Sequence, residues 1–251
     1  MSRRARKQKC NKYRNKDHNN KGEHLRLIQG GAPLERVRNK KVTITPRNFH
    51  QDDLIGLLED KNINIVFAVG PAGTGKTIVS TLQGIKALKN GDCDKFVVTR
   101  PAVSVDEQHG FLPGTLQEKM APWTRPIFDV FEEFYSPEQI DYMLNDNKVE
   151  IAPLAFMRGR TFKNSYIIAD EMQNATDNQM KMLLTRIGDN SKLVVTGDLA
   201  QHDRGFESNG LKMFIERLVN AKSERIKVVQ FNNADIERHP VVDEVLKLYE
   251  L

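Results

Sequence analysis

The chain has 251 residues, of which 28% are charged, and carries a net charge of +5 with a mean hydropathy of −0.53. This length allows one large domain, or one domain with small additions, and no apolar run approaches the roughly 20 residues that a membrane helix needs. We therefore expect a cytoplasmic protein with no membrane partner. Cys10 and Cys93 lie far apart and outside any metal-ligand spacing, which predicts free thiols in a reducing compartment and disfavours a zinc site.

Residues 1–24 form a basic tail with almost nothing to bury. Within residues 1–21, nine lysines and arginines accompany a single acid, Asp17, so this stretch has a net charge of +8 and the remainder has −3. Such a composition predicts disorder. Two interpretations stay open. The tail is either an arm that binds nucleic acid through its phosphates, with Tyr13 as the only residue able to stack on a base, or a solubilising segment without a fixed partner.

The next segment, residues 25–45, reads as a lead-in with a possible edge strand at Val42–Thr45. A turn and a short helix with leucines on one face are expected over Pro46–Glu59. The string Asn48-Phe49-His50-Gln51 lies at the start of this helix. A glutamine amide can pair with both the N6 donor and the N7 acceptor of adenine, so Gln51 is predicted to set a preference for ATP.

A P-loop pattern, G-x-x-x-x-G-K-[ST], follows an apolar run. The run Asn64–Val69 has the composition of a buried strand, and Ile78–Lys89 reads as an amphipathic helix. Glycines let several N–H groups point at one phosphate, and the helix N-terminus adds partial positive charge. Lys76 can reach the β- and γ-phosphates, and the Thr77 hydroxyl can ligate Mg²⁺. The predicted nucleotide site comprises Gly70, Pro71, Ala72, Gly73, Thr74, Gly75, Lys76 and Thr77.

Strand-like apolar runs alternate with helical stretches along the chain. This alternation predicts an α/β fold with a mostly parallel sheet and helices on both faces, in a single domain over residues 25–251. The predicted strands are Ile65–Val69, Lys95–Thr99, Val149–Ala152, Ser165–Ala169, Lys192–Thr196 and Arg225–Phe231.

A less regular, helical insertion is expected at about residues 103–148. Its last helix has a start signal in Ser136-Pro137-Glu138-Gln139, with serine at the N-cap, proline at N1 and glutamine at N3. Aromatic residues of the insertion could stack on nucleic acid, but the three-residue spacing of two phenylalanines favours packing inside a helical subdomain. The aromatic residues are Trp123, Phe128, Phe131 and Phe134.

Two adjacent acids, Asp170 and Glu171, follow the predicted strand Ser165–Ala169. The carboxyl end of a parallel strand faces the ligand crevice, so Asp170 is placed to hold Mg²⁺ opposite Thr77. Glu171 is placed to orient or deprotonate the attacking water. The alternative is a solvated strand end with two ordinary surface acids. The occurrence of this acid pair after a P-loop in the same chain favours the catalytic interpretation. The second acid, Glu171, favours hydrolysis over phosphate transfer to a substrate.

A further buried strand ends in Thr196-Gly197-Asp198, with Gln201 three residues beyond the aspartate. A polar side chain at this place can touch the γ-phosphate and report its presence, and Gln201 is predicted to be that sensor. Glycine-aspartate after a strand is also a common turn signal, so Gln201 is expected to be carried by a turn.

Together these elements resemble the ATPase half of superfamily 1 helicases, and longer strings resemble the PhoH-like family. The resemblance covers roughly residues 42–250 and leaves the basic tail outside. It implies a RecA-like P-loop NTPase core that hydrolyses ATP with Mg²⁺, a role on RNA or single-stranded nucleic acid, and ring-shaped homo-oligomers. The strings that carry it are Val98–Val103, Gly110–Gly114, Pro153–Thr161, Asp170–Asn174, Leu184–Gly188 and Arg238–Val242.

Phosphoryl transfer usually needs an arginine to neutralise charge in the transition state. Superfamily 1 helicases take it from a second RecA-like domain, for which this chain has no room. A neighbouring subunit could supply it, and a head-to-tail contact that closes makes a ring such as a hexamer. Arg238 is favoured because it begins a family string, while an ordinary ion pair is the alternative for each candidate. The other candidates are Arg100, Arg158, Arg160 and Arg186.

Three functions fit these features. The first is an ATP-driven motor or remodeller acting on RNA or single-stranded DNA. The second is a nucleotide-switched nucleic-acid-binding protein without motor activity. The third, a small-molecule kinase, shares the P-loop but is disfavoured by the second acid, Glu171, and by the turn that carries Gln201.

Overall fold

The computed structural model describes residues 40–101, 116–201, 209–238 and 240–249. The chain falls into two units, residues 1–40 and 41–251, and every element described below belongs to the second. The predicted basic tail and the string Gly110–Gly114 lie outside the described residues. Among the helices that are described, none combines the length and the apolar character required to cross a bilayer.

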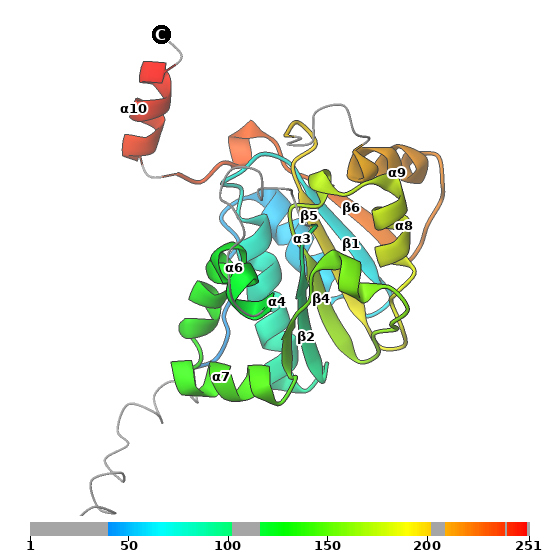
Figure 1. The fold of residues 1–251 in the computed structure, drawn as a ribbon. Helices are drawn as coiled ribbons and strands as arrows, with labels where there is room; N and C mark the ends of the chain where they lie inside the picture. Colours follow the sequence, from blue (N-terminus) through cyan, green and yellow to red (C-terminus); the bar gives the residue numbers. More distant parts are fainter. Residues whose placement is uncertain (1–39, 102–115, 202–208, 239, 250–251) are drawn as a thin grey trace, which may run out of the picture. The chain divides into compact units, whose positions relative to one another are not determined.

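Six parallel strands form one sheet in the order β3-β2-β4-β5-β1-β6 (Figure 1). The strand before the P-loop, β1, is therefore separated from the strand before the two acids, β4, by β5 alone. Each strand agrees within one residue with its prediction. The strands are β1 (Ile65–Val69), β2 (Lys95–Thr99), β3 (Val149–Ile151), β4 (Ser165–Ala169), β5 (Lys192–Gly197) and β6 (Ile226–Gln230).

Helices cover both faces of this sheet (Figure 1). One face is covered by α3 (Phe49–Glu59), α4 (Lys76–Asn90), α6 (Leu116–Glu132) and α7 (Pro137–Asn145). The other is covered by the 3₁₀ turn η1 (Leu154–Met157) with α8 (Asp177–Leu184) and α9 (Gly210–Val219). The remaining elements are the 3₁₀ turns η2 (Met172–Asn174) and η3 (Asn233–Asp235), and the helix α10 (Pro240–Tyr249).

The strands are buried on both faces, which explains their continuous apolar runs. All five residues of β1 are buried. Val66 and Ala68 pack into the core under α3, α4 and α6, whereas Ile65, Phe67 and Val69 pack into the core under α8 and α9. The predicted α/β fold, with a parallel sheet between two helical layers, is confirmed.

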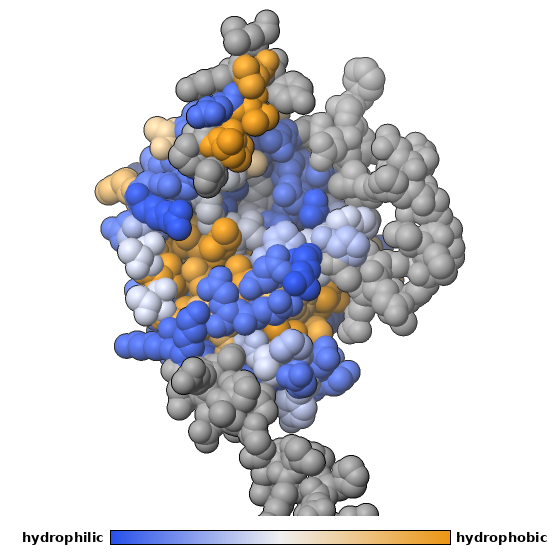
Figure 2. Space-filling model, turned by 90° about the vertical axis from the view of Figure 1, so that its left-hand side faces the viewer, coloured by the Kyte–Doolittle hydropathy of each residue, from blue (hydrophilic) through white to orange (hydrophobic). Residues whose placement is uncertain are grey.

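The described part of the insertion packs as a helical layer. Phe131 and Phe134 are buried and belong to the core that α4 shares, and Phe128 packs against it partly buried. The packing interpretation is thus confirmed for these residues. The predicted start of α7 is also confirmed, because Ser136 and Gln139 form a reciprocal capping box. Figure 2 shows the side of the molecule that lies on the left in Figure 1, where hydrophilic side chains cross a surface that also exposes hydrophobic ones.

The predicted edge strand at Val42–Thr45 is wrong, because these residues are assigned to no strand and pair with none of the six. Val42 is buried, and Ile44 is partly buried against the same core as α3. The segment is therefore held by side-chain packing and not by a backbone ladder. Its β-branched residues suit any half-buried extended segment, with or without a strand partner.

Candidate nucleotide-binding site

The P-loop turns sharply between the end of β1 and the start of α4, and glycine conformations make the turn possible. Gly70, Gly73 and Gly75 have φ angles of 142°, 84° and 83°, a region that other residues rarely adopt. A Cβ on Gly70 would also lie 2.5 Å from the Phe231 carbonyl oxygen. Gly75 is the N-cap of α4 and makes no side-chain capping bond. The N–H groups of the first turn are therefore available to an anion, as a phosphate cradle requires.

Lys76 is buried at the first position of α4. Its Nζ donates to the carbonyl oxygens of Gly70 (2.8 Å) and Pro71 (2.6 Å), and it also lies 3.2 Å from the Thr74 hydroxyl. Burial lowers the pKa of Lys76, while the carboxylates of the nearby acids oppose that shift. The ammonium thus lies inside the loop, close to where a bound phosphate would need a counter-charge.

Asp170 meets the P-loop helix at the carboxyl end of the sheet. Its Oδ1 accepts hydrogen bonds from the Thr77 hydroxyl (3.0 Å) and from the Thr196 hydroxyl. Thr77 and Asp170, the predicted metal ligands, are therefore brought together. Hydroxyl and carboxylate oxygens are the hard ligands that Mg²⁺ prefers, so the donor set fits this ion. Thr196, the last but one residue of β5, was not predicted, because the sequence marked only the turn that follows it.

Glu171 stands at a strained position directly after Asp170. Its φ of 54° places a non-glycine residue in the left-handed region. The carboxylate accepts a hydrogen bond from Gln173 Nε2 (2.5 Å), while Gln173 Oε1 accepts one from the Asp198 N–H (3.1 Å). Gln173 is almost fully buried. It therefore links the predicted catalytic acid to the end of β5, a role that sequence reasoning missed although the residue lies in a family string.

Gln201 lies where it was predicted, on a turn after β5. The turn is fixed by the Ala200 N–H, which donates to Asp198 Oδ1 (2.9 Å). The Gln201 side chain is exposed, and residues 202–208, which follow it, lie outside the described part of the chain. The structure thus places Gln201 at the carboxyl edge of the sheet, and its sensor role stays a prediction.

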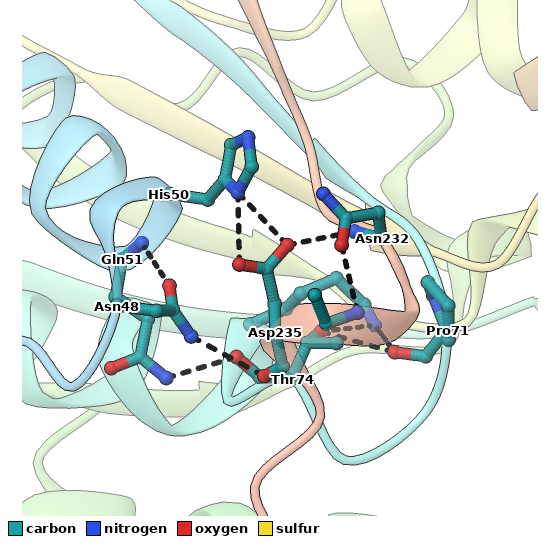
Figure 3. Close-up of polar contacts among 9 residues, drawn as sticks. Asn48, His50, Gln51, Pro71, Thr74, Asn232 and Asp235 are labelled. Carbon is teal, nitrogen blue, oxygen red and sulfur yellow. Dashed lines mark hydrogen bonds and ion pairs between the residues drawn. The ribbon is translucent and has the colours of Figure 1, made fainter.

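Gln51 lies against the P-loop, with its amide bonded to the chain (Figure 3). Its Oε1 accepts from the Arg47 N–H (2.9 Å), and its Nε2 donates to the Thr74 carbonyl (3.0 Å). The residue is buried. Each end of the amide keeps capacity for one more hydrogen bond. Pairing with adenine therefore stays a prediction, whereas contact with the loop is what the structure shows.

Arg238 lies over the P-loop of its own chain. Its Nη2 donates to the Ala72 carbonyl (3.3 Å), and its side chain is in close contact with Gly73. Strand β6 lies beside β1 and so places Arg238 next to its own loop. Its contribution to a neighbouring subunit stays a prediction. Two other candidates are bound within the fold: Arg160 pairs with Glu150, and Arg186 donates to main-chain carbonyls.

Comparison with known proteins gives the family. The profile of the PhoH-like protein family matches residues 43–250. A PhoH-like protein of Synechocystis sp. is 41% identical over 218 residues, which cover 86% of this chain and 65% of that protein. Protein PhoH of Escherichia coli K12 is 42% identical over 231 residues, covering 89% and 64%. The chain therefore spans less than two thirds of the length of these curated relatives.

Among solved structures, the Pif1 helicase of Candida albicans aligns with a TM-score of 0.40 and 14% identity, over 82% of this chain and 44% of that chain. The family profile covers most of the chain, and relatives near 40% identity share the greater part of it. The chain therefore belongs to the PhoH-like protein family.

Proposed function

We propose that the chain binds ATP with Mg²⁺ at the P-loop and hydrolyses it to ADP and phosphate. One observation carries this proposal: the oxygens of Thr77, Thr196 and Asp170 meet beside the uncapped N-terminus of α4, next to the buried ammonium of Lys76. Mg²⁺ held by these oxygens would neutralise charge on the phosphates.

The remaining residues have proposed roles in that reaction. The N–H groups of the loop and of the first turn of α4 bind the phosphate oxygens, and Lys76 faces them with its positive charge. Glu171 orients the attacking water and accepts its proton, and Gln173 holds its carboxylate. Arg238 adds positive charge from the same chain, and Gln201 reports on the γ-phosphate.

We extend the proposal to an ATPase that acts on RNA or single-stranded nucleic acid and assembles as a ring-shaped homo-oligomer. The most specific activity that we propose is that of a helicase. The support is the resemblance of the motifs and the net charge of +8 in residues 1–21, which suits contact with phosphates. The alternative is a nucleotide-switched binding protein, in which a slow ATPase cycles the protein between states and the tail tethers it to nucleic acid.

Measurement of phosphate release from Mg–ATP, with and without single-stranded RNA, tests the proposal. Free phosphate that disappears in Glu171→Gln supports the ATPase. Stimulation by RNA, lost when residues 1–24 are removed, supports a motor, whereas basal hydrolysis unaffected by RNA supports the switch. Phosphate that appears on an added acceptor, and not in solution, would establish a kinase instead. Light scattering with and without ATP measures the assembly state.

A further inference from the structure

The first turn of α3 and the segment after β6 meet beside the P-loop (Figure 3). His50 Nδ1 lies 2.9 Å from Oδ1 and 2.8 Å from Oδ2 of Asp235, although the two residues are 185 positions apart. The Asp235 side chain is only 7% exposed. Burial would raise the pKa of Asp235, but the hydrogen bonds from His50 and the Asn232 N–H outweigh it and hold that pKa below its usual value.

Both members of this pair are anchored in their own elements. Asp235 Oδ2 accepts from the Asn232 N–H (2.8 Å), which closes a capping box around η3. The Asp235 carbonyl accepts from Asn48 Nδ2 (3.3 Å), and Asn48 Oδ1 caps α3 by accepting from the Gln51 N–H (2.9 Å). The pair therefore ties the start of α3 to the segment 232–238 through a network that includes both helix caps.

The same two elements hold three consecutive carbonyls of the P-loop. The bonds run from Arg238 Nη2 to Ala72 O (3.3 Å), from the Glu237 N–H to Gly73 O (3.0 Å) and from Gln51 Nε2 to Thr74 O (3.0 Å). The carbonyl and the N–H of one trans peptide point in opposite directions. Holding these carbonyls on the outside of the loop therefore aims the next N–H groups, those of Gly73, Thr74 and Gly75, away from the flanking elements.

We propose that His50 and Asp235 are positioning residues for the nucleotide. Their pair closes a clamp, formed by the first turn of α3 and the segment 232–238, that fixes the direction of the phosphate-binding amides. The inference rests on the proposed ATP site, since the clamp matters for binding only if a phosphate occupies the loop. Neither residue needs to touch the nucleotide, because both act through the backbone of the loop.

Steady-state hydrolysis of Mg–ATP separates this role from general stability. His50→Ala and Asp235→Asn are expected to raise KM roughly tenfold, the effect of losing one charge-assisted contact, with a much smaller change in kcat because Glu171 and Asp170 are untouched. His50→Asn keeps a donor near the position of Nδ1 and is expected to restore most of the affinity. The double variant is expected to be no worse than either single one.

Asp177→Asn provides the matched control. It breaks an exposed ion pair with Arg217 between α8 and α9, on the other face of the sheet, and is expected to leave KM unchanged. An unchanged KM in folded His50→Ala, beside a wild type that hydrolyses ATP, would overturn the clamp and leave the proposed function standing.

Hydrogen exchange provides a measure of the clamp that does not depend on ATP. The amides of residues 72–76 are expected to exchange faster in His50→Ala than in the wild type, since the elements that carry the donors to the three loop carbonyls are no longer tied together by the pair. Faster exchange supports the clamp even if the wild type binds no ATP, a result that would defeat the proposed function alone. Exchange at the wild-type rate in His50→Ala would overturn the clamp.

Discussion

Two lysines with little exposure to solvent, Lys76 and Lys192, lie at opposite ends of the strands of the same sheet, and the surroundings of their ammonium groups differ. Lys76 begins α4 at the carboxyl edge, and Lys192 begins β5 at the amino edge. Burial lowers the pKa of both, to about 8 for Lys192. Each ammonium donates to main-chain carbonyls. Lys192 reaches those of Leu57, Leu58 and Asp60 at 3.2, 2.6 and 2.8 Å, at and just after the end of α3.

The difference lies in what surrounds them. Lys192 satisfies carbonyls that the end of a helix leaves without partners, so its role is structural. Lys76 is bonded within a glycine loop, and three carboxylates influence its charge, those of Asp198, Glu171 and Asp170. Lys192 has one acid, Asp60, beside it. Three carboxylates together with the unbonded amides of the loop therefore distinguish Lys76 as part of a ligand site.

The position of a cavity also bears on which end of the sheet is structural and which is functional. It opens at the amino ends of the strands and is lined by Asn64, Ser165 and Lys192 among others. Ligands of open parallel sheets bind at the carboxyl ends of the strands, and that is where the P-loop, Asp170 and Glu171 lie. The chemistry of the site, and not the size of a hollow, therefore identifies the functional edge.

The largest effect is expected at the acid beside Lys76. Glu171→Gln should lower kcat for ATP hydrolysis by about 10²- to 10⁴-fold, the usual contribution of a general base, while Mg–ATP still binds. Phosphate release and titration of a fluorescent nucleotide measure the two properties separately. Glu138→Gln, an exposed acid at the start of α7, serves as the control, and normal turnover by Glu171→Gln would exclude it as the catalytic acid.

Exchanging the two lysines for methionine tests the comparison directly. Lys76→Met should weaken Mg–ATP binding by roughly 10- to 100-fold, the loss of a hydrogen-bonded charge. It should lower the free energy of unfolding less than Lys192→Met does, because only the Gly70 carbonyl loses its side-chain donor, while the Pro71 carbonyl keeps the Thr74 hydroxyl. Nucleotide titration and urea denaturation of the same preparation measure both. Wild-type affinity in Lys76→Met would show that the loop amides alone hold the phosphates.

Much of this site could be predicted because its signals are local. Parallel strands buried on both faces appear as continuous apolar runs, so the strands were placed within one residue, and the P-loop and the acids follow two of them. Because β6 lies beside β1, His50 pairs with Asp235 and Arg238 lies next to the P-loop of its own chain. No local pattern encodes that order. The false strand at Val42–Thr45 shows the converse, because β-propensity does not supply a partner.

Lys192→Met should show the opposite behaviour to Lys76→Met. The carbonyls of Leu57 and Leu58 would lose the Lys192 donor, whereas that of Asp60 keeps the Ile63 N–H. The free energy of unfolding should therefore fall by about 1–3 kcal/mol, measured by urea denaturation. The affinity for Mg–ATP should stay at the wild-type value. Loss of nucleotide affinity in a folded Lys192→Met variant would contradict the division of roles between the two edges.

The smallest effect is the pH dependence that Lys192 confers. Burial, opposed by Asp60, lowers its pKa from 10.5 to about 8. Between these values the unfolded chain binds more protons than the folded one, so the contribution of Lys192 to stability rises with pH across this window. Burial of Cys93 raises its thiol pKa from 9.0 to about 11, which lowers stability over an overlapping range. The difference between wild type and Lys192→Met therefore isolates the lysine.

That difference in unfolding free energy, followed by urea denaturation from pH 7 to 10.5, should increase as the pH rises. A difference that falls instead would show that the three carbonyls retain the ammonium more strongly than burial disfavours it. In that case Lys192 would be a charged cap at every accessible pH. The two lysines would then differ in the net effect of their surroundings on the pKa as well as in the number of acids nearby, three for Lys76 and Asp60 for Lys192.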